Sequence, residues 1–347
     1  MCYHSWEPAG EATDVIIKAR AHARVGLIGN PSDGYYGKTI ALILRNFAAE
    51  VTVYQTPELE IVPGQEDTPT YPSLSELTAD VELNGYYGGV RLVKATVNRF
   101  ARTFLGDRLP EVDRNFTIRY RSDIPRQVGL AGSSAIIAAT TRALCRFYDV
   151  QIDKAAMPTF VLEVETKELE LNAGLQDRVI QVYEGAVYMD FDRTLMEATG
   201  HGRYEPLDPG LLPPLFVAYR TDVGELSTVT HSDLRERFKL GDPAVVDGMA
   251  ECARLTERAR ELLLAGKGAE IGELMDRNFD VRRSMCELDP LNVRMIEIAR
   301  AYHGHPKFSG SGGAIVGVYP GDDAYAAMTA ELEQLHCRVI RPGIYKV

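Results

Sequence analysis

One stretch, residues 124–139, constrains the fold and chemistry of this chain more than any other. It reads Ile-Pro-Arg-Gln-Val-Gly-Leu-Ala-Gly-Ser-Ser-Ala-Ile-Ile-Ala-Ala, so a loop of small residues leads into an Ala-rich run that we predict to be a helix. Glycine allows close ligand approach, and serine at a helix start can cap free N–H groups. The remaining N–H groups and the helix dipole favour an anion such as phosphate. The alternative is a plain glycine-rich turn before a buried helix.

Length and composition predict a two-domain globular enzyme. The chain has 347 residues, of which 45% are hydrophobic and 25% charged, and domains usually span about 100–200 residues. The net charge of −11 argues against general binding to nucleic acids or membrane surfaces, although not against a nucleotide in a small basic cleft. No apolar run is long enough to span a membrane, and the N-terminus lacks the features of a secretion signal. We therefore expect a cytoplasmic protein.

The cysteines and histidines show no metal-binding or disulfide pattern. No C-x-x-C and no His-x-x-x-His pair occurs, so we expect neither a zinc site nor a disulfide framework. Cys145 and Cys252 lie in apolar helical patterns and are predicted to be core residues. Neither Gly-x-Gly-x-x-Gly nor a Walker A sequence is present, which disfavours a nicotinamide enzyme and a P-loop. The five cysteines are Cys2, Cys145, Cys252, Cys286 and Cys337.

Hydrophobic periodicity predicts strands and helices in both halves of the chain, which favours an α+β fold. Residues 57–72, rich in proline and acids, predict a loop or sheet edge, and residues 200–214 predict a domain boundary. The domains would be 1–205 and 206–347. We expect strands at 23–29, 40–53, 115–121, 186–191, 215–219 and 337–340, a strand–turn–strand unit at 307–319, and helices at 88–105, 134–148, 157–171, 244–265, 269–285, 292–302 and 324–335.

Three glycine-centred segments follow one another in a fixed order: Arg24–Asp33, Pro125–Ala135 and Lys307–Val318. Together they resemble the three motifs of the GHMP small-molecule kinases, and the resemblance runs from about residue 23 to the end of the chain. It implies the two-domain GHMP kinase fold, with an N-terminal nucleotide-binding α/β domain and a C-terminal ferredoxin-like α+β domain. It also implies ATP as co-substrate and Mg²⁺ as cofactor.

Further strings are similar to the glucuronokinase branch of that family, whose members use ATP to phosphorylate the anomeric hydroxyl of D-glucuronate. The sequence departs from the general family in two places. Ala131 and Gly132 precede Ser133, which lengthens the second motif by one residue, and Gly29 is followed by Asn-Pro-Ser-Asp where relatives often have Glu-His. The strings that carry the similarity are residues 84–92, 114–117, 124–127, 173–179 and 279–283.

The resemblance implies two catalytic residues. Asp177, in Gly-Leu-Gln-Asp, would accept the proton of the sugar hydroxyl or orient and polarise that hydroxyl. Arg24 stands where relatives carry a basic residue, and could neutralise charge on the transferred phosphoryl group. A turn or cap role for Asp177, and a surface position for Arg24, are the alternatives.

The nucleotide and metal residues follow from the second motif. Ser134 is the implied hydroxyl ligand of Mg²⁺, and Glu165 is the matching carboxylate, with Glu168 as its rival. Oxygen donors suit Mg²⁺, which keeps several waters. The residues expected to cradle the ATP phosphates are Gly129, Ala131, Gly132, Ser133, Ser134 and Ala135.

For the sugar, we expect Asn30 and Asp33 to contact hydroxyls and Gly312 of the third motif to close over the phosphates and sugar. A uronate also needs a cation for its carboxylate, and arginine binds carboxylates in a fixed bidentate geometry. Arg126 leads because it adjoins the phosphate loop. Its rivals are Arg91, Arg282 and Arg283.

The function expected is ATP- and Mg²⁺-dependent 1-phosphorylation of a sugar acid, with D-glucuronate as the favoured substrate. The alternatives are a kinase for galacturonate or a neutral hexose, and a GHMP-fold protein without kinase activity, either decarboxylase-like or a binding protein. We expect small-molecule partners only, without nucleic acid or membrane, and a homodimer remains open.

Overall fold

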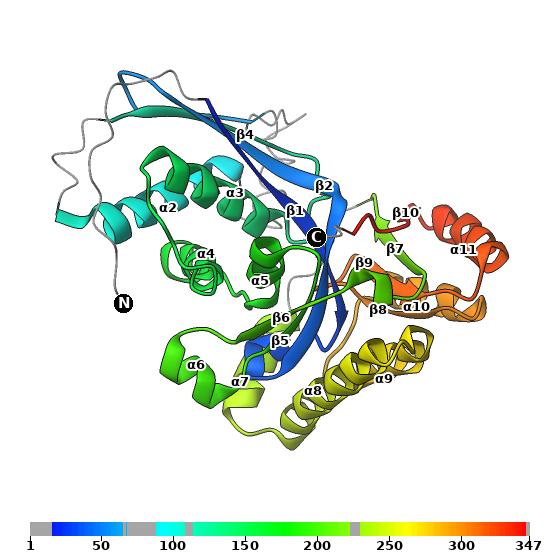
Figure 1. The fold of residues 1–347 in the computed structure, drawn as a ribbon. Coiled ribbons are helices and arrows are strands. Elements are labelled where there is room, and N and C mark those ends of the chain that lie inside the picture. The colour runs from blue at the N-terminus through cyan, green and yellow to red at the C-terminus, as the bar shows by residue number, and fades with distance from the viewer. Residues whose placement is uncertain (1–15, 65–66, 68–87, 108–113, 223–229, 345–347) are drawn as a thin grey trace, which may run out of the picture. The chain divides into compact units, whose positions relative to one another are not determined.

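The computed structural model describes residues 16–64, 67, 88–107, 114–222 and 230–344. Cys2, the N-terminal segment considered as a signal, and residues 84–87 of one motif string lie outside this part. Figure 1 shows the elements. The strands are β1 (Ile17–Ile28), β2 (Lys38–Gln55), β3 (Glu60–Val62), β4 (Phe116–Ser122), β5 (Ala186–Asp190), β6 (Arg203–Leu207), β7 (Leu215–Arg220), β8 (His305–Phe308), β9 (Ala314–Val318) and β10 (Cys337–Ile340).

Seven of the helices that the structure describes lie close to helices predicted from the sequence. The helices are α2 (Gly89–Phe100), α3 (Gly132–Phe147), α4 (Met157–Glu163), α5 (Gln176–Tyr183), α6 (Arg193–Thr199), α7 (Thr230–Lys239), α8 (Pro243–Leu264), α9 (Ile271–Met285), α10 (Pro290–Ala301) and α11 (Asp322–Gln334). Two predicted helices end in a π-helical turn, at Ala101–Leu105 after α2 and at Val164–Glu168 after α4. Helices α5, α6 and α7 were not predicted.

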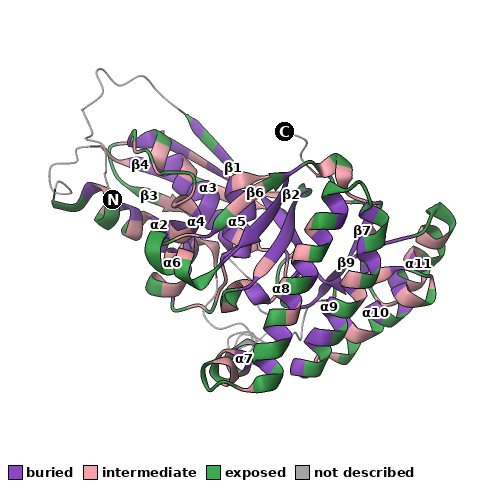
Figure 2. Ribbon diagram, turned by 60° about the horizontal axis from the view of Figure 1, so that its bottom comes forward, coloured by how far each residue is buried: buried purple, intermediate pink, exposed green. Residues whose placement is uncertain are grey.

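Helix α8 shows how local chemistry sets an element. Asp242 accepts a hydrogen bond from the Ala244 amide at 3.0 Å, and Pro243 occupies the first helical position. Both features favour a helix start. Buried Val245, Met249 and Cys252 then recur at helical spacing, and Figure 2 shows buried and exposed residues alternating along the helix. This amphipathic stripe explains why the helix could be predicted.

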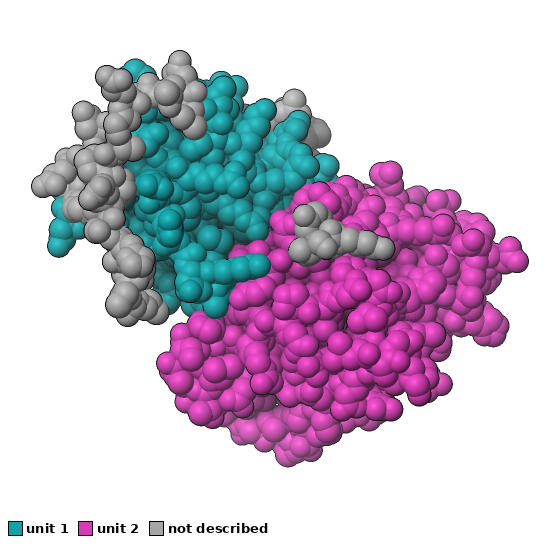
Figure 3. Space-filling view, viewed as in Figure 1, with its two compact units in different colours: residues 1–21, 48–123, 132–171 teal, residues 22–47, 124–131, 172–347 magenta. Residues whose placement is uncertain are grey.

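Contacts divide the chain into two compact units (Figure 3): residues 1–21, 48–123 and 132–171 form unit 1, and residues 22–47, 124–131 and 172–347 form unit 2. These units are defined by contacts within the structure, whereas the boundary predicted between residues 205 and 206 separates two folding domains. That boundary stays a prediction. Residues 200–214, predicted as a boundary segment, include strand β6. This strand pairs antiparallel with β5.

Unit 1 is built on β3, β4 and the second part of β2. Strand β4 pairs antiparallel with β2, from Ala49 opposite Ser122 to Gln55 opposite Phe116, and parallel with the short strand β3. Strand β3 thus puts part of the proline-rich stretch at a sheet edge, as expected, whereas residues 65–66 and 68–72 of that stretch lie outside the described residues. Aromatic rings from α2, α3, β4, α4 and the residues that follow α2 and α3 pack together in the unit, namely Phe100, Phe104, Phe116, Phe147, Tyr148 and Phe160.

Unit 2 carries the first part of β2 paired antiparallel with β5, and a second sheet in the order β10-β7-β9-β8. All pairs in this second sheet are antiparallel. Its core includes Phe216, Phe279 and Phe308, and α10 and α11 contribute Met295 and Met328. The β8–β9 hairpin confirms the predicted strand–turn–strand unit. Two sheets with mixed helices confirm the α+β fold class.

Two smaller expectations concern membranes and cysteines. Within the described residues, no helix combines the length and the apolar character needed to cross a bilayer. Cys252 is fully buried, as predicted, whereas Cys145 is only partly buried. Burial raises the pKa of both thiols to about 12, so both stay protonated at neutral pH.

Candidate active site

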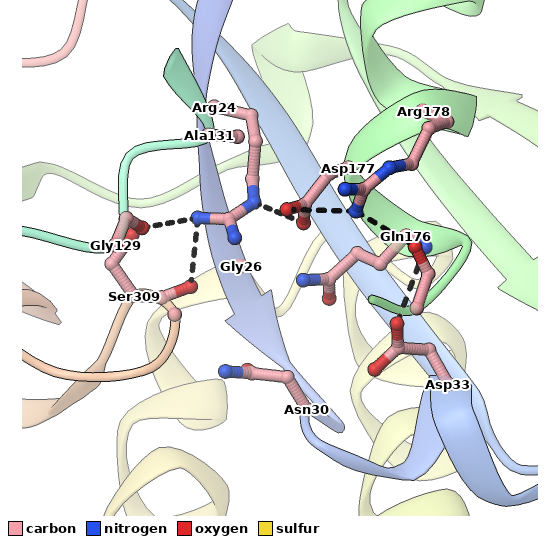
Figure 4. Close-up of polar contacts among 12 residues, drawn as sticks. Arg24, Gly26, Asn30, Asp33, Gly129, Ala131, Gln176, Asp177, Arg178 and Ser309 are labelled. Carbon is pink, nitrogen blue, oxygen red and sulfur yellow. Dashed lines mark hydrogen bonds and ion pairs between the residues drawn. The ribbon is translucent and has the colours of Figure 1, made fainter. Parts of the chain in front are cut away.

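Parts of all three glycine segments meet within unit 2, as Figure 4 shows around Arg24. The Gly26 amide donates a hydrogen bond to the Ser309 carbonyl at 3.0 Å, and the Arg24 amide donates to the Leu130 carbonyl at 3.2 Å. The end of β1 therefore lies between the second segment and the β8–β9 loop. These contacts join residues more than a hundred positions apart in the chain.

Glycine is required here because the backbones approach one another closely. A Cβ atom on Gly26 would lie 2.6 Å from the Ser309 carbonyl oxygen, and one on Gly310 would lie 2.4 Å from the Gly129 carbonyl oxygen. Gly129 itself has a φ of +69°, a conformation that other residues rarely adopt. Ala131 also has a positive φ, +64°, which is costly for a residue with a Cβ.

Arg24 and Asp177 form the central ion pair of the site. The Nε of Arg24, on β1, donates to Asp177 Oδ1 at 2.5 Å, and its Nη1 donates to the carbonyl oxygens of Gly129 at 2.5 Å and Ser309 at 3.4 Å. Asp177 lies in the first turn of α5. The guanidinium is thereby fixed between the catalytic candidate and two glycine segments.

Arg178 holds the other side of the Asp177 carboxylate. Its Nη1 lies 3.2 Å from Asp177 Oδ2 and donates to the Gly174 carbonyl at 2.8 Å. Burial alone would raise the pKa of Asp177, but Arg24 and Arg178 outweigh burial and lower it below its ordinary value. Asp177 is therefore ionised at neutral pH.

Asp33 has the opposite electrostatics. Burial, followed by repulsion from Asp177, raises its pKa from 3.8 to about 6, although the Gln176 amide donates to its Oδ2 at 3.3 Å. The chain passes close to this carboxylate at Gly174, where a Cβ would lie 2.2 Å from Asp33 Oδ2. The two candidate sugar-contacting carboxylates thus belong to one cluster.

A buried lysine ties the first segment to the third. Lys307 is 2% exposed, and its ammonium donates to the carbonyls of Gly26 at 2.9 Å and Phe308 at 2.7 Å and to Asn30 Oδ1. Burial lowers the pKa of Lys307 well below its ordinary value. The Asn30 side chain, predicted to bind the sugar, is itself buried and spans Lys307 and the Phe308 carbonyl.

Helix α9 holds the backbone of the first and third glycine segments through two of its side chains. Asn278 Oδ1 accepts from the Gly29 amide at 2.8 Å, and its Nδ2 donates to the Asn30 carbonyl at 3.3 Å. Arg282 donates to the carbonyls of Gly310 at 2.7 Å and Ser311 at 3.1 Å. Gly312, expected near the substrate, lies in the same loop with a φ of +147°.

In unit 1, the small residues Gly132, Ser133, Ser134 and Ala135 form the first turn of α3. Ser134 is buried in this turn, and Glu165 is 3% exposed in the π-helical turn after α4. Both offer oxygen donors of the kind Mg²⁺ prefers. Within the described residues, no three His, Cys, Asp or Glu side chains gather as a metal cluster, so Mg²⁺ would depend on water and phosphate oxygens as well.

The rival Glu168 is engaged elsewhere in unit 1. Its Oε2 accepts from Asn98 at 3.0 Å and its Oε1 from Arg99 at 3.3 Å. Arg99 also pairs with Glu163. Two side chains of α2 thus hold the Glu168 carboxylate, and the choice between Glu165 and Glu168 as a ligand of Mg²⁺ stays a prediction.

The four arginine candidates for the sugar carboxylate differ in burial. Arg126, Arg91 and Arg283 are exposed, and Arg91 donates to the Leu169 carbonyl at 3.3 Å. Arg282 is buried under the third loop. Exposure weakens the argument for Arg126, because only a desolvated contact would discriminate strongly.

Arg235 of α7 was missed from the sequence. It is partly buried and lies 3.3 Å from Asn172 Oδ1, in the loop that leads to α5. Burial raises the pKa of Tyr35, while Arg235 lowers it and Asp33 raises it. Arg235 and Asp33 therefore both act electrostatically on the Tyr35 phenol. Nothing in the sequence singled out Arg235, because an isolated arginine in a polar helix is common.

Gln176, Arg178, Asn278 and Lys307 were also missed, although three of them lie inside strings that attracted attention. Arg178 and Gln176 adjoin Asp177, and Lys307 opens the third segment. Polar residues beside glycine turns were the signal that could have pointed to them as site residues. Most of their partners lie far away in the chain, so the sequence did not show what they bind.

The sequence of this chain matches one family model and is similar to several known proteins. The family model described as GHMP kinases N terminal domain matches residues 91–185. Glucuronokinase 1 of Arabidopsis thaliana is 42% identical over 314 residues, which cover 88% of this chain and 86% of that protein. Probable glucuronokinase 2 of the same organism is 42% identical over 309 residues, covering 87% and 84%.

Among solved structures, the galactokinase of Lactococcus lactis complexed with galactose matches with a TM-score of 0.72. The match covers 96% of this chain and 95% of that chain, at 15% sequence identity. A likeness at this identity concerns the fold, and it agrees with the two sheets and the helices described above.

Proposed function

The chain belongs to the GHMP kinase family, and from this premise we propose that it transfers the γ-phosphoryl group of ATP to the anomeric hydroxyl of D-glucuronate. Glucuronate 1-phosphate and ADP would be the products. Identity of 42% to two glucuronokinases over most of both chains supports this substrate. The alternatives within the family are galacturonate and neutral hexoses.

The arrangement of Arg24 and Asp177 carries the proposal. An ionised carboxylate beside a fixed guanidinium can orient a hydroxyl while the cation stabilises negative charge on the phosphoryl oxygens. The sugar oxygen bonds to the γ-phosphorus as the bond to the β-phosphate oxygen breaks, and the hydroxyl proton moves to Asp177. Because the transition state is loose, the proton can leave late, and a strong base is unnecessary.

The second segment supports nucleotide binding. Gly129 and Ala131 hold positive φ angles, and the loop leads into the first turn of α3, whose N–H groups favour phosphate oxygens. Ser134 and Glu165 would hold Mg²⁺, which neutralises phosphate charge when bound. Asp33, Asn30 and Gly312 would complete the sugar side.

The product of phosphoryl transfer tests the proposal. The protein is incubated with ATP, Mg²⁺ and, in turn, glucuronate, galacturonate, glucose and galactose, and each product is identified by NMR. We expect phosphate on the anomeric carbon and the highest kcat/KM with glucuronate. Equal use of glucose and glucuronate would reject the uronate assignment, and consumption of ATP without a stable phosphosugar would favour a decarboxylase-like reaction.

The partner of the sugar carboxylate is tested with a matched pair of variants, Arg126→Ala and Arg235→Ala. A site that holds a cation for the carboxylate rejects glucose, because the arginine would be left without its partner. The variant that lowers the kcat/KM ratio of glucuronate to glucose identifies the contact. A ratio unchanged in both variants would shift the contact to Arg91, Arg282 or Arg283 and leave the kinase assignment intact.

Location and assembly belong to the same proposal. Among the described residues no disulfide joins Cys145, Cys252, Cys286 or Cys337, and thiols of this kind suit a reducing cytoplasm. A homodimer is the simplest assembly to test, by light scattering at micromolar concentration.

A further inference from the structure

The carboxamide oxygen of Gln176 is a buried acceptor that no mechanism above uses. Gln176 is 2% exposed, and its Oε1 has no hydrogen-bond partner among the described residues. A buried polar atom left without a partner is costly, and such atoms are rare in folded proteins. An acceptor of this kind, next to Asp177, points to a ligand that donates a hydrogen bond.

The rest of Gln176 is already committed to the site. Its backbone amide donates to Asp33 Oδ2 at 3.3 Å, and its side chain is among the groups that lower the pKa of Asp177. The donor end of the carboxamide, its nitrogen, is the end that favours a charged carboxylate. The oxygen is left for a ligand.

Figure 4 shows where the carboxamide lies. It extends from the start of α5 toward Gly26 and Asn30, between Asp177 and Asp33. A Cβ on Gly26 would lie 3.0 Å from its nitrogen, so the missing side chain at residue 26 leaves room for the carboxamide. The acceptor thus occupies the space between the two carboxylates assigned to the sugar.

We propose that Gln176 Oε1 accepts a hydrogen bond from the hydroxyl on carbon 2 of the sugar. The inference rests on the proposed function, in which Asp177 addresses the hydroxyl on carbon 1. Carbon 1 is flanked by the ring oxygen and by carbon 2. The ring oxygen carries no proton, so the 2-hydroxyl is the neighbouring group that can donate to an acceptor beside Asp177.

This contact makes Gln176 a specificity-determining residue. A sugar with a 2-hydroxyl satisfies the buried oxygen, whereas a 2-deoxy sugar leaves it without a partner. A site built to bond a hydroxyl rejects the analogue that lacks it, more strongly than a site that only fills space. The contact also fixes the ring so that the anomeric hydroxyl faces Asp177.

The experiment measures kcat/KM for glucuronate, 2-deoxyglucuronate, 2-deoxy-2-fluoroglucuronate and 3-deoxyglucuronate, in the wild type and in Gln176→Met. Met has a similar length and no acceptor oxygen. In the wild type we expect the 2-deoxy sugar to be used roughly 10- to 100-fold less well. The 2-fluoro sugar should be as poor, because fluorine cannot donate a hydrogen bond. In Gln176→Met the penalty for the 2-deoxy sugar should shrink to less than about threefold.

Gln181→Met is the matched control, because Gln181 belongs to the same helix and is fully buried. Its Nε2 donates to the His22 carbonyl at 3.2 Å and to the Ala131 carbonyl at 2.9 Å, so its carboxamide holds the backbone of β1 and of the second segment. We expect Gln181→Met to lower the melting temperature and to keep the full 2-deoxy penalty.

Several outcomes would overturn the inference. They are an unchanged 2-deoxy penalty in Gln176→Met, a 2-fluoro sugar as good as glucuronate, or loss of the 3-deoxy penalty instead. An equal loss on every sugar with a lower melting temperature would make Gln176 structural. If glucuronate is not phosphorylated at all, the proposed function fails separately, and the same comparison on the accepted sugar and its 2-deoxy analogue decides the role of Gln176.

Discussion

Asp177 is held as an anion by two arginines, and this determines what it can do in a reaction. Arg24 and Arg178 lower its pKa despite burial, so it is a weak base that remains charged well below neutral pH. Such a group orients a hydroxyl and accepts a proton late, which suits a loose phosphoryl transition state. Acid-dependent loss of activity near pH 6 would therefore have to come from another group.

Asp177→Asn should lower kcat by roughly 100-fold or more and change the dissociation constant of ATP by less than about threefold. The carboxylate acts on the hydroxyl and not on the nucleotide, and the amide cannot accept the proton. Steady-state kinetics and calorimetric ATP titration test both values. Turnover within a few-fold of the wild type would make Asp177 structural.

Asp190→Asn is a fair control for Asp177→Asn, because Asp190 is also buried and pairs with two cations. Its Oδ2 lies 2.9 Å from Arg203 and 3.6 Å from Lys38. Both variants should unfold at lower temperature, since each leaves cations without their anion. Only Asp177→Asn should lose kcat.

Asp33→Asn should stabilise the free protein at neutral pH and not near pH 4. The pKa of Asp33 is raised to about 6 from 3.8, so the folded state binds its proton more tightly than the unfolded state. Between these values the stability contributed by Asp33 falls as pH rises, and the loss is complete above about pH 6. The upper limit of the gain is about 3 kcal/mol.

Urea unfolding of the wild type and Asp33→Asn, near pH 4 and near pH 7.5, measures this difference. The same variant should have a higher KM for the sugar, because an amide replaces the charged acceptor. If Asp33→Asn is less stable than the wild type at neutral pH, the carboxylate has a favourable partner and the argument from burial is wrong.

At the scale of elements, the β8–β9 loop depends on close contact between the backbones of the second and third glycine segments. Gly310→Ala should lower kcat/KM for ATP by roughly tenfold or more. A Cβ at residue 310 would lie 2.4 Å from the Gly129 carbonyl oxygen, so one of the two backbones must move. Such a movement displaces the loop groups that position the ligand. Gly310 does not have a positive φ, so the effect would be steric and not conformational.

Gly321→Ala provides the comparison, because a Cβ at Gly321 meets nothing within 4 Å and its φ of 174° is ordinary extended backbone. It should leave the kinetics unchanged. Similar losses in both variants would point to a general effect of alanine on folding, and wild-type kinetics in Gly310→Ala would mean that the loop moves aside freely.

Elements with strong periodicity were predictable, and weakly patterned ones were not. Helices α8 and α9 carry apolar stripes over four turns or more, and β4 alternates cleanly. Helix α5 has eight residues, Gln-Asp-Arg-Val-Ile-Gln-Val-Tyr, and β-branched residues in so short a run favour a strand as much as a helix. Its buried face also includes Arg178 and Gln181, so it lacks an apolar stripe.

At the scale of the whole molecule, the catalytic candidates were found through a family resemblance and their partners were not. Arg24 meets Asp177 across 153 positions and Lys307 meets Asn30 across 277. Local patterns carry no information on such contacts, because they depend on the packing of whole sheets and helices. This is why Gln176, Arg235 and Asn278 emerged only in three dimensions.

The net charge of the whole chain predicts how salt affects the two kinds of sugar. A molecule with a charge of −11 repels an anionic uronate at long range, whereas the arginines of the site lie in a buried region that salt screens less. Raising the ionic strength from about 10 to about 100 mM, with saturating ATP and Mg²⁺, should therefore raise kcat/KM for glucuronate roughly two- to threefold. Glucose, which is neutral, serves as the control and should show no change. A fall for glucuronate alone would mean that cations near the sugar site dominate the long-range field, and an equal change for both sugars would mean that salt acts on the protein and not on the approach of the substrate.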